Sequence, residues 1–204
     1  MGTEASLQIG PGRRRSGGFT LMELMIVLAI AGVVLALGTP NFNEFRRNNR
    51  LTSAANDFLA SVQLARGEAI KRQRIVSLCA SNNPRAANPA CSTGAFAGWI
   101  VFEDANGDCS RTAAEPVLRG EGPVDSAINA ASDGFCASFA PTGFSRDLAA
   151  GTEAATVLFC DERGMALQSG TTQSAARGVG LTRTGRGQVT RDPATLTGWG
   201  LACP

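Results

Sequence analysis

The chain of 204 residues contains no histidine and no tyrosine, and it has one lysine among its 19 basic residues. Without histidine, it lacks the side chain that most often serves as a general base or a metal ligand. It also lacks a Gly-x-Ser-x-Gly nucleophile motif, a phosphate-binding loop and a zinc-type cysteine spacing. These absences predict a protein that is not an enzyme and that needs no cofactor.

A basic leader followed by one long apolar run is the most informative feature that is present. Arginines at 13–15 precede Gly18, and the run then covers residues 19–37, interrupted by a carboxylate at Glu23. Nineteen residues are about enough to span a bilayer and more than a usual secretory signal contains. A charge inside such a helix costs roughly 2.5–3.5 kcal/mol, so Glu23 requires a compensating partner. The alternatives are a secretory signal peptide cleaved near residues 36–38 and a plain signal anchor, and neither explains Glu23.

The residues Gly18-Phe19-Thr20-Leu21 together with Glu23 resemble the class III signal of type IV pilins and pseudopilins. The resemblance implies that a prepilin peptidase cuts after Gly18 and that the new terminal residue, Phe19, is N-methylated. It also implies that Glu23 pairs with the terminal amine of a neighbouring subunit in a filament. Pairing would offset the cost of burying that charge.

Charges and cysteines indicate how the chain is oriented. Three arginines and one acid, Glu4, precede the apolar run, so the N-terminus is expected to stay in the cytoplasm. Arg46, Arg47 and Arg50 follow the run and weaken this asymmetry. The even count of six cysteines fits an oxidising compartment. We therefore expect a single-pass inner-membrane protein whose C-terminal domain is periplasmic and which later enters a pilus or pseudopilus.

Helical periodicity continues beyond Pro40, which is expected to kink the helix rather than end it. Apolar residues recur at alternating steps of four and three, which predicts one stripe of an amphipathic helix running to about Lys71. The stripe consists of Leu51, Ala55, Phe58, Val62, Ala65 and Ala69. A single long helix is thus predicted over about residues 19–72.

The remaining residues have the composition of β-structure with turns. Strands are expected at 75–79, 99–102, from Val117, at 156–160 with a hairpin partner at 165–167, and at 179–184 with a hairpin partner at 188–190. Loops are expected at 81–92 and 127–133. The predicted class is α+β, with a long N-terminal helix, transmembrane in one half and amphipathic in the other, packed on antiparallel sheet. The expected segments are a leader at 1–18, a transmembrane helix at 19–40, an amphipathic half at 41–73 and a periplasmic domain at 74–204.

Several further stretches resemble the GspH/FimT branch of this class. They are residues 49–56, 63–72, 98–102, 104–108, 115–119 and 184–186. The resemblance implies a type IV pilin-like fold and a structural subunit of a type II secretion pseudopilus or of a type IV pilus. The implied partners are other pilins or pseudopilins, the prepilin peptidase and an inner-membrane assembly platform.

Basic residues near the C-terminus suggest an alternative function. They are Arg177, Arg183, Arg186 and Arg191. Some FimT-type minor pilins bind DNA in natural transformation through a Gly-Arg-x-Arg element, and Gly185-Arg186 matches its first half. Gln188 stands where the second arginine would be, and Arg183 or Arg191 is the candidate substitute. The competing interpretations are salt-sensitive binding of double-stranded DNA and a solvated hairpin with ordinary surface arginines.

An acidic loop provides a weak calcium candidate. Asp104, Asn106, Asp108 and Glu115 occupy positions 1, 3, 5 and 12 of a calcium-binding loop. Cys109 replaces the glycine usual at position 6, and no flanking helix pair is expected. The favoured alternative is a polar hairpin turn built on Asn106-Gly107.

The six cysteines leave the disulfide connectivity open. Cys79 with Cys91 is the favoured pair because it closes a short loop. Cys160 with Cys203 would tie the C-terminus to the sheet, and Cys109 with Cys136 then remains. Such bridges contribute roughly 2–4 kcal/mol each. Metal binding by these cysteines is disfavoured because there is no Cys-x-x-Cys pair.

Overall fold

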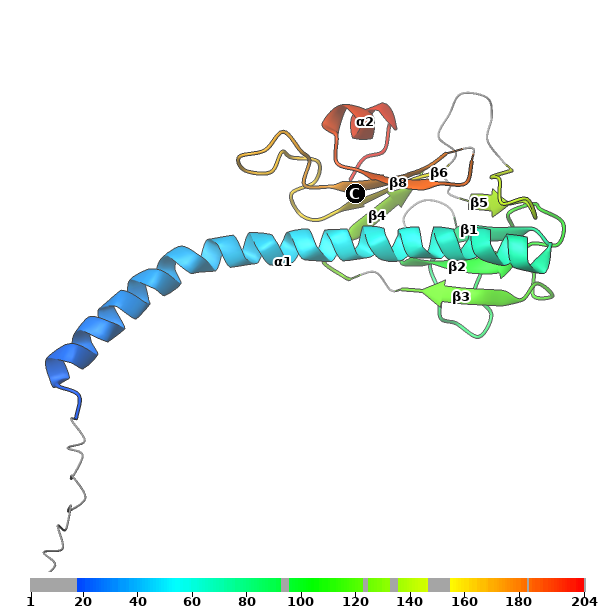
Figure 1. Cartoon of the computed structure of the whole chain (residues 1–204). Helices are drawn as coiled ribbons and strands as arrows, with labels where there is room; N and C mark the ends of the chain where they lie inside the picture. The colour runs from blue at the N-terminus through cyan, green and yellow to red at the C-terminus, as the bar shows by residue number, and fades with distance from the viewer. Residues whose placement is uncertain are drawn as a thin grey trace, which may run out of the picture. The chain divides into compact units, whose positions relative to one another are not determined.

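The computed structural model describes residues 18–92, 96–122, 125–132, 136–146, 155–182 and 184–203, without the side chains of 37–41 and 155. The chain divides into two compact units, Met1–Asn43 and Glu44–Pro204. The helices are α1 (Leu21–Arg72) and α2 (Pro193–Gly198). The strands are β1 (Val76–Ser81), β2 (Gly98–Glu103), β3 (Val117–Glu121), β4 (Asn129–Ser132), β5 (Cys136–Phe139), β6 (Ala155–Cys160), β7 (Arg177–Leu181) and β8 (Gly187–Thr190) (Figure 1).

Helix α1 confirms the predicted long helix, and both of its ends have local causes. At the start, the Thr20 hydroxyl accepts a hydrogen bond from the Glu23 amide at 3.2 Å, which is the geometry of an N-cap. The helix continues through Pro40 without a break. At the far end, Gln73 adopts a φ of 56° and the Arg74 amide donates to the Ala69 carbonyl at 3.3 Å. This is a Schellman motif, which satisfies carbonyls of the last turn.

The described strands form two antiparallel four-stranded sheets. Sheet A has the order β3-β2-β1-β5, and sheet B has the order β4-β6-β7-β8. Their buried apolar faces share one core with the C-terminal part of α1, which lies along the strands of both sheets (Figure 1). The Phe58 ring makes edge contacts with Trp99 of sheet A at 5.2 Å and with Phe159 of sheet B at 5.9 Å between ring centroids. One helix stripe therefore joins the two sheets, and the predicted fold class is confirmed.

Three details of the strand prediction are wrong. Residues 165–167 do not form a hairpin with β6, because β6 pairs with β4 and β7 and only Leu167 makes an isolated bridge, to Ser174. The expected loop at 127–133 contains strand β4. Strand β5 was not expected at all. β4 and β5 are four residues each, so pairing with a neighbouring strand decides their conformation more than local propensity does.

Helix α2 was also missed, although the sequence carries a signal for it. The Asp192 carboxylate accepts a hydrogen bond from the Thr195 amide at 2.8 Å, and Pro193 occupies the first turn. An N-cap followed by proline is a typical helix start. The helix rests on β7 at Gly178, where a Cβ would lie 2.4 Å from both Leu196 and Trp199. Glycine is thus required there for the helix to approach the strand.

Candidate functional site

The predicted processing site lies just outside helix α1. Gly18, Phe19 and Thr20 are non-helical and exposed, and among the described residues beyond its chain neighbours nothing lies within 4 Å of a Cβ placed on Gly18. The leader residues 1–17 lie outside the described part of the chain. Glu23 is exposed in the first helical turn, where a negative charge complements the helix dipole.

Apolar side chains of the first unit are left uncovered. Their exposed fractions range from 51% to 81%. They are Phe19, Leu21, Met22, Leu24, Met25, Ile26, Val27, Leu28, Ile30, Val33, Val34 and Leu35. Contiguous apolar surface on this scale marks an interaction site for protein or lipid.

Across the described residues, no helix has the combination of length and apolarity that a membrane span needs. The assignment of residues 19–40 to a transmembrane helix stays a prediction.

The predicted DNA-binding arginines occupy different places. Arg186 is exposed at the turn between β7 and β8, and its amide donates to the Thr182 hydroxyl at 3.2 Å. Gly185 has a φ of 73°, and a Cβ there would lie 2.6 Å from the Gly143 carbonyl, so the turn needs glycine. Arg183 falls outside the described residues. Arg191 lies just beyond the other end of β8 and donates to the Ser174 carbonyl at 3.4 Å.

Two arginines of the C-terminal set stabilise the domain itself. Besides Ser174, the Arg191 guanidinium donates to the Gln168 side chain. Arg177 is 4% exposed and donates to the Ala175 and Ala176 carbonyls at 2.7 and 3.2 Å. Burial lowers the pKa of Arg177 to about 10, and repulsion from Arg191 and Arg163 adds to the effect. Arg177 is therefore buried, although the sequence analysis groups it with basic residues that could contact DNA.

The calcium candidate is not assembled as a metal site. The Asp104 carboxylate accepts hydrogen bonds from the Ser77 hydroxyl at 2.6 Å and from the Gly107 and Cys109 amides at 2.7 and 3.1 Å. The Glu115 carboxylate accepts bonds from the Ala105 and Thr112 amides. Within the described ranges, no group of three or more acidic or cysteine side chains could hold a metal ion.

The acidic side chains instead shape the connection between β2 and β3. Both Asp104 and Glu115 are buried. Their hydrogen bonds with backbone amides stabilise a loop in which Gly107 and Cys109 have positive φ. Asp108 bonds to Asn106 within the same loop. In this loop the carboxylates thus satisfy backbone donors that would otherwise be unpaired, which is the arrangement of a polar turn.

All six cysteines are paired. The bonds are Cys79–Cys91, Cys109–Cys136 and Cys160–Cys203. These are the pairs that the sequence analysis favours. The third bond joins β6 to the C-terminal segment beyond α2, and the first two lie together at sheet A.

A polar cluster between α1 and the turn after β6 was missed. Arg163 donates to the Asp161 carboxylate at 2.6 Å and to the Asn48 side chain at 3.0 Å. Burial alone would raise the pKa of Asp161, but its hydrogen bonds with Arg163 outweigh burial and hold the pKa below its usual value. Arg47 forms an adjacent ion pair with Glu162 at 2.7 Å. Sequence spacing gives no sign of the contacts with α1, because Asn48 and Arg47 are each more than a hundred residues from their partners.

A family model described as type II transport protein GspH matches residues 54–185. The chain belongs to the GspH family. A second model, the prokaryotic N-terminal methylation motif, matches residues 13–39 and so includes Gly18, Phe19 and Glu23. GspH-family proteins are structural pilins or pseudopilins and not enzymes, so this chain is a type IV pilin-like minor pilin or pseudopilin.

Three curated relatives share shorter stretches with this GspH-family chain. Two fimbrial proteins of Pseudomonas aeruginosa are each 35% identical over 60 residues, which is 29% of this chain and 39% of theirs. The type IV major pilin protein PilA of Myxococcus xanthus (strain DK1622) is 44% identical over 46 residues, which is 22% of this chain and 21% of PilA. The chain therefore spans well under half of these relatives.

Two solved structures of the Pseudomonas aeruginosa (strain PAO1) type IV minor pilin FimU are also similar. The first is 22% identical with a TM-score of 0.46 and covers 68% of this chain and 91% of FimU. The second is 23% identical with a TM-score of 0.47 and covers 74% of this chain and 94% of FimU.

Proposed function

We propose that this GspH-family protein is a structural subunit of a filament, either a type II secretion pseudopilus or a type IV pilus. One observation carries the proposal. The apolar residues from Phe19 to Leu35 are exposed, whereas the stripe from Leu51 to Ala69 is buried in the subunit's own core. The exposed set has the size and apolarity of a surface that neighbouring subunits or lipid would cover.

Processing precedes assembly in this proposal. A prepilin peptidase cleaves after Gly18, and Phe19 becomes a methylated N-terminus. Before assembly, residues 19–40 hold the protein in the inner membrane, with the leader in the cytoplasm and residues 74–204 in the periplasm. An inner-membrane platform then transfers the subunit into the filament. The exposed, non-helical backbone at residues 18–20 supports this proposal because a peptidase needs extended, accessible chain.

Glu23 directs assembly in this scheme by pairing with the terminal amine of a neighbouring Phe19. The test is to replace Glu23 by Ala and by Gln and to measure incorporation into sheared filaments. Both variants are expected to enter the membrane normally and to be lost from filaments, because each removes the charge that compensates the amine. Asp57→Ala, which removes an exposed acid from the second half of α1, is the control. Normal incorporation of Glu23→Gln would show that pairing does not drive assembly.

A second candidate function is the capture of double-stranded DNA. It is supported by Arg186, which is exposed at the β7–β8 turn and makes no side-chain hydrogen bond or ion pair in the described part of the chain. Arg183 belongs to the same turn by sequence. Arg191 is a weaker candidate, because its guanidinium already contacts Ser174 and Gln168.

DNA binding is tested with the full chain in non-ionic detergent at several salt concentrations. If the turn contacts phosphates, Arg186→Ala should weaken binding and reduce the salt slope by about one unit. Arg85→Ala removes an exposed arginine from the loop after β1 and should leave the slope unchanged. An identical slope for Arg186→Ala and the unmodified chain would assign Arg186 to the ordinary solvated surface.

A further inference from the structure

Two disulfides meet at one end of sheet A. Strands β1 and β5 are antiparallel, and Cys79 lies directly opposite Cys136 in the last of their four registered pairs. Residues opposed in this way project from the same face, with Cβ atoms about 4.5–5.5 Å apart. Cys79 and Cys136 also belong to one apolar cluster with Ile100 and Phe102. Each strand cysteine is therefore a neighbour of the other, although each is bonded to a different loop.

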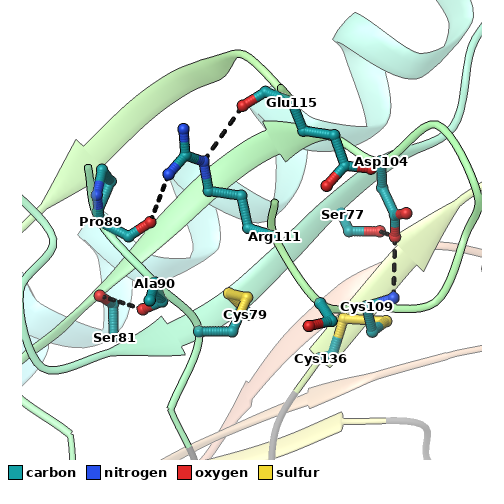
Figure 2. The surroundings of a disulfide bond; sticks show 12 residues. Ser77, Cys79, Ser81, Pro89, Ala90, Asp104, Cys109, Arg111, Glu115 and Cys136 are labelled. Atoms are coloured by element: carbon teal, nitrogen blue, oxygen red, sulfur yellow. Dashed lines mark hydrogen bonds between the residues drawn. A yellow bond between two sulfur atoms is a disulfide. The ribbon is translucent and has the colours of Figure 1, made fainter. Parts of the chain in front are cut away.

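The loop cysteines are held at the same end of the sheet. Arg111, two residues after Cys109, donates to the Glu115 carbonyl at 3.2 Å and to the Pro89 carbonyl at 2.8 Å (Figure 2). The loop before Cys91 is fixed in turn by a bond from the Ser81 hydroxyl to the Ala90 carbonyl at 2.7 Å. One arginine thus links the segment that carries Cys91 to the segment that carries Cys109.

The two disulfides differ in exposure. Cys109 and Cys136 are both partly exposed, whereas the other bond joins partly exposed Cys91 to Cys79, which is 1% exposed. A thiol from solution can therefore approach the Cys109–Cys136 bond from either cysteine, but the Cys79–Cys91 bond only from Cys91. Directly opposed residues of antiparallel strands have Cα atoms about 4.5–5.5 Å apart. This distance lies within the Cα–Cα range of disulfides, usually about 4.4–6.8 Å.

We propose that Cys79 and Cys136 form a thiol–disulfide exchange site that converts the two loop disulfides into one cross-strand disulfide. A dithiol reductant first reduces Cys109–Cys136 by two electrons and is itself oxidised to a disulfide. The Cys136 thiolate then attacks the Cys79 sulfur, so that a Cys79–Cys136 bond forms and the Cys79–Cys91 bond breaks. Cys91 leaves as a thiolate and takes up a proton. The product holds one disulfide and free thiols at Cys91 and Cys109.

The exchange has a structural consequence that neither loop disulfide has alone. The new bond would hold β1 against β5 covalently, at the edge of sheet A where β5 has a single neighbour. At the same time it would release the loops that carry Cys91 and Cys109. A periplasmic dithiol is the chemical class of partner that this site takes. The proposal is independent of filament assembly and of DNA binding.

The primary test uses the full chain in non-ionic detergent. It is treated with limiting dithiothreitol, quenched in acid, labelled with N-ethylmaleimide and mapped by mass spectrometry without further reduction. The expected result is a Cys79–Cys136 cross-linked peptide in molecules labelled at Cys91 and Cys109. If partly reduced molecules carry labels at Cys109 and Cys136 with Cys79–Cys91 intact, and no cross-strand peptide forms, the proposal is overturned.

A matched pair of variants removes the need for reductant. Cys109→Ser frees Cys136 opposite Cys79, and the label is expected on Cys91 together with a Cys79–Cys136 peptide. Cys136→Ser frees Cys109 in the loop instead, and Cys79–Cys91 is expected to stay intact with the label on Cys109. Circular dichroism of the β-structure checks that both variants are folded. Displacement of Cys91 to the same extent by Cys109 would overturn the cross-strand assignment, because loop motion alone would then explain the exchange.

Discussion

The two halves of helix α1 use apolar residues in opposite ways. In the first half, Leu28 is 62% exposed and its apolar neighbours surround the helix on all sides. In the second half, Leu51 is fully buried and its apolar neighbours form one stripe, opposite polar residues. The same residue type in the same helix therefore stabilises the subunit in one half and leaves surface for a partner in the other. Periodicity, rather than the amount of apolar sequence, separates self-packing from assembly.

The largest effect is expected at Gly18, just before the first half of α1. Gly18→Ala is expected to block cleavage, so that the mature mass is replaced by that of the chain with its leader. Gly18 is exposed and lies within the match to the methylation motif, and the proposed cleavage follows it. Mass spectrometry of the membrane fraction measures the result. Gly17→Ala is the adjacent control and should still be processed; a normal mature mass for Gly18→Ala would place the cut elsewhere.

Leucine-to-alanine substitutions compare the two halves directly. Leu51→Ala should lower the free energy of unfolding by roughly 2–5 kcal/mol, because it opens a cavity under the two sheets. Leu28→Ala should change it by less than about 0.5 kcal/mol, because this side chain is mostly exposed in the subunit. Denaturant unfolding in non-ionic detergent, followed by circular dichroism of the β-structure, gives both values. Equal losses would mean that the first half also packs within its own subunit.

Removal of a disulfide tests whether these bonds stabilise only the second unit, Glu44–Pro204. Replacing both Cys160 and Cys203 by Ser should cost roughly 2–4 kcal/mol, since the bond closes the chain from β6 to the segment beyond α2. All six cysteines lie beyond α1, so helicity of the first half should not change. Thermal unfolding monitored by circular dichroism checks the loss. An unchanged unfolding temperature would show that α2 holds the C-terminus through packing alone.

The smallest expected effect concerns acid stability of the second unit. Because hydrogen bonds from Arg163 hold the folded-state pKa of Asp161 below its unfolded value of about 3.9, the carboxylate stabilises the fold above that value. This contribution should disappear as the pH falls through the lower, folded pKa. Arg163→Met should reduce the loss of unfolding free energy at acid pH, measured in a series of unfolding experiments. Arg47→Met, which removes an exposed ion pair, should leave most of that loss in place. An unchanged loss of stability at acid pH in Arg163→Met would show that Arg163 does not cause it.

The sequence could predict elements that have local causes but not those that depend on long-range contacts. Helix α1, the β7–β8 hairpin and the Cys79–Cys91 pair have local or spacing signals, and the structure places them as expected. Strand β4 has none, because its Asn-Ala-Ala-Ser sequence becomes a strand only through pairing with β6. Arg177 was expected among surface charges, but the turn before β7 directs carbonyls at it and buries it. Asp192-Pro193, in contrast, was a readable helix start.

The hydrogen bond from the Trp99 indole to the Ser61 hydroxyl, 2.8 Å long, joins α1 to sheet A in the core. The chain has two tryptophans and no tyrosine, so its near-ultraviolet fluorescence excited at 295 nm comes from Trp99 and Trp199 alone. Trp99 is 3% exposed and Trp199 is half-buried on β7, so their emission spectra should differ in wavelength. In a Trp199→Phe protein, the single remaining fluorophore would report continuously on whether the helix still lies on its sheet, in solution or within an assembled filament.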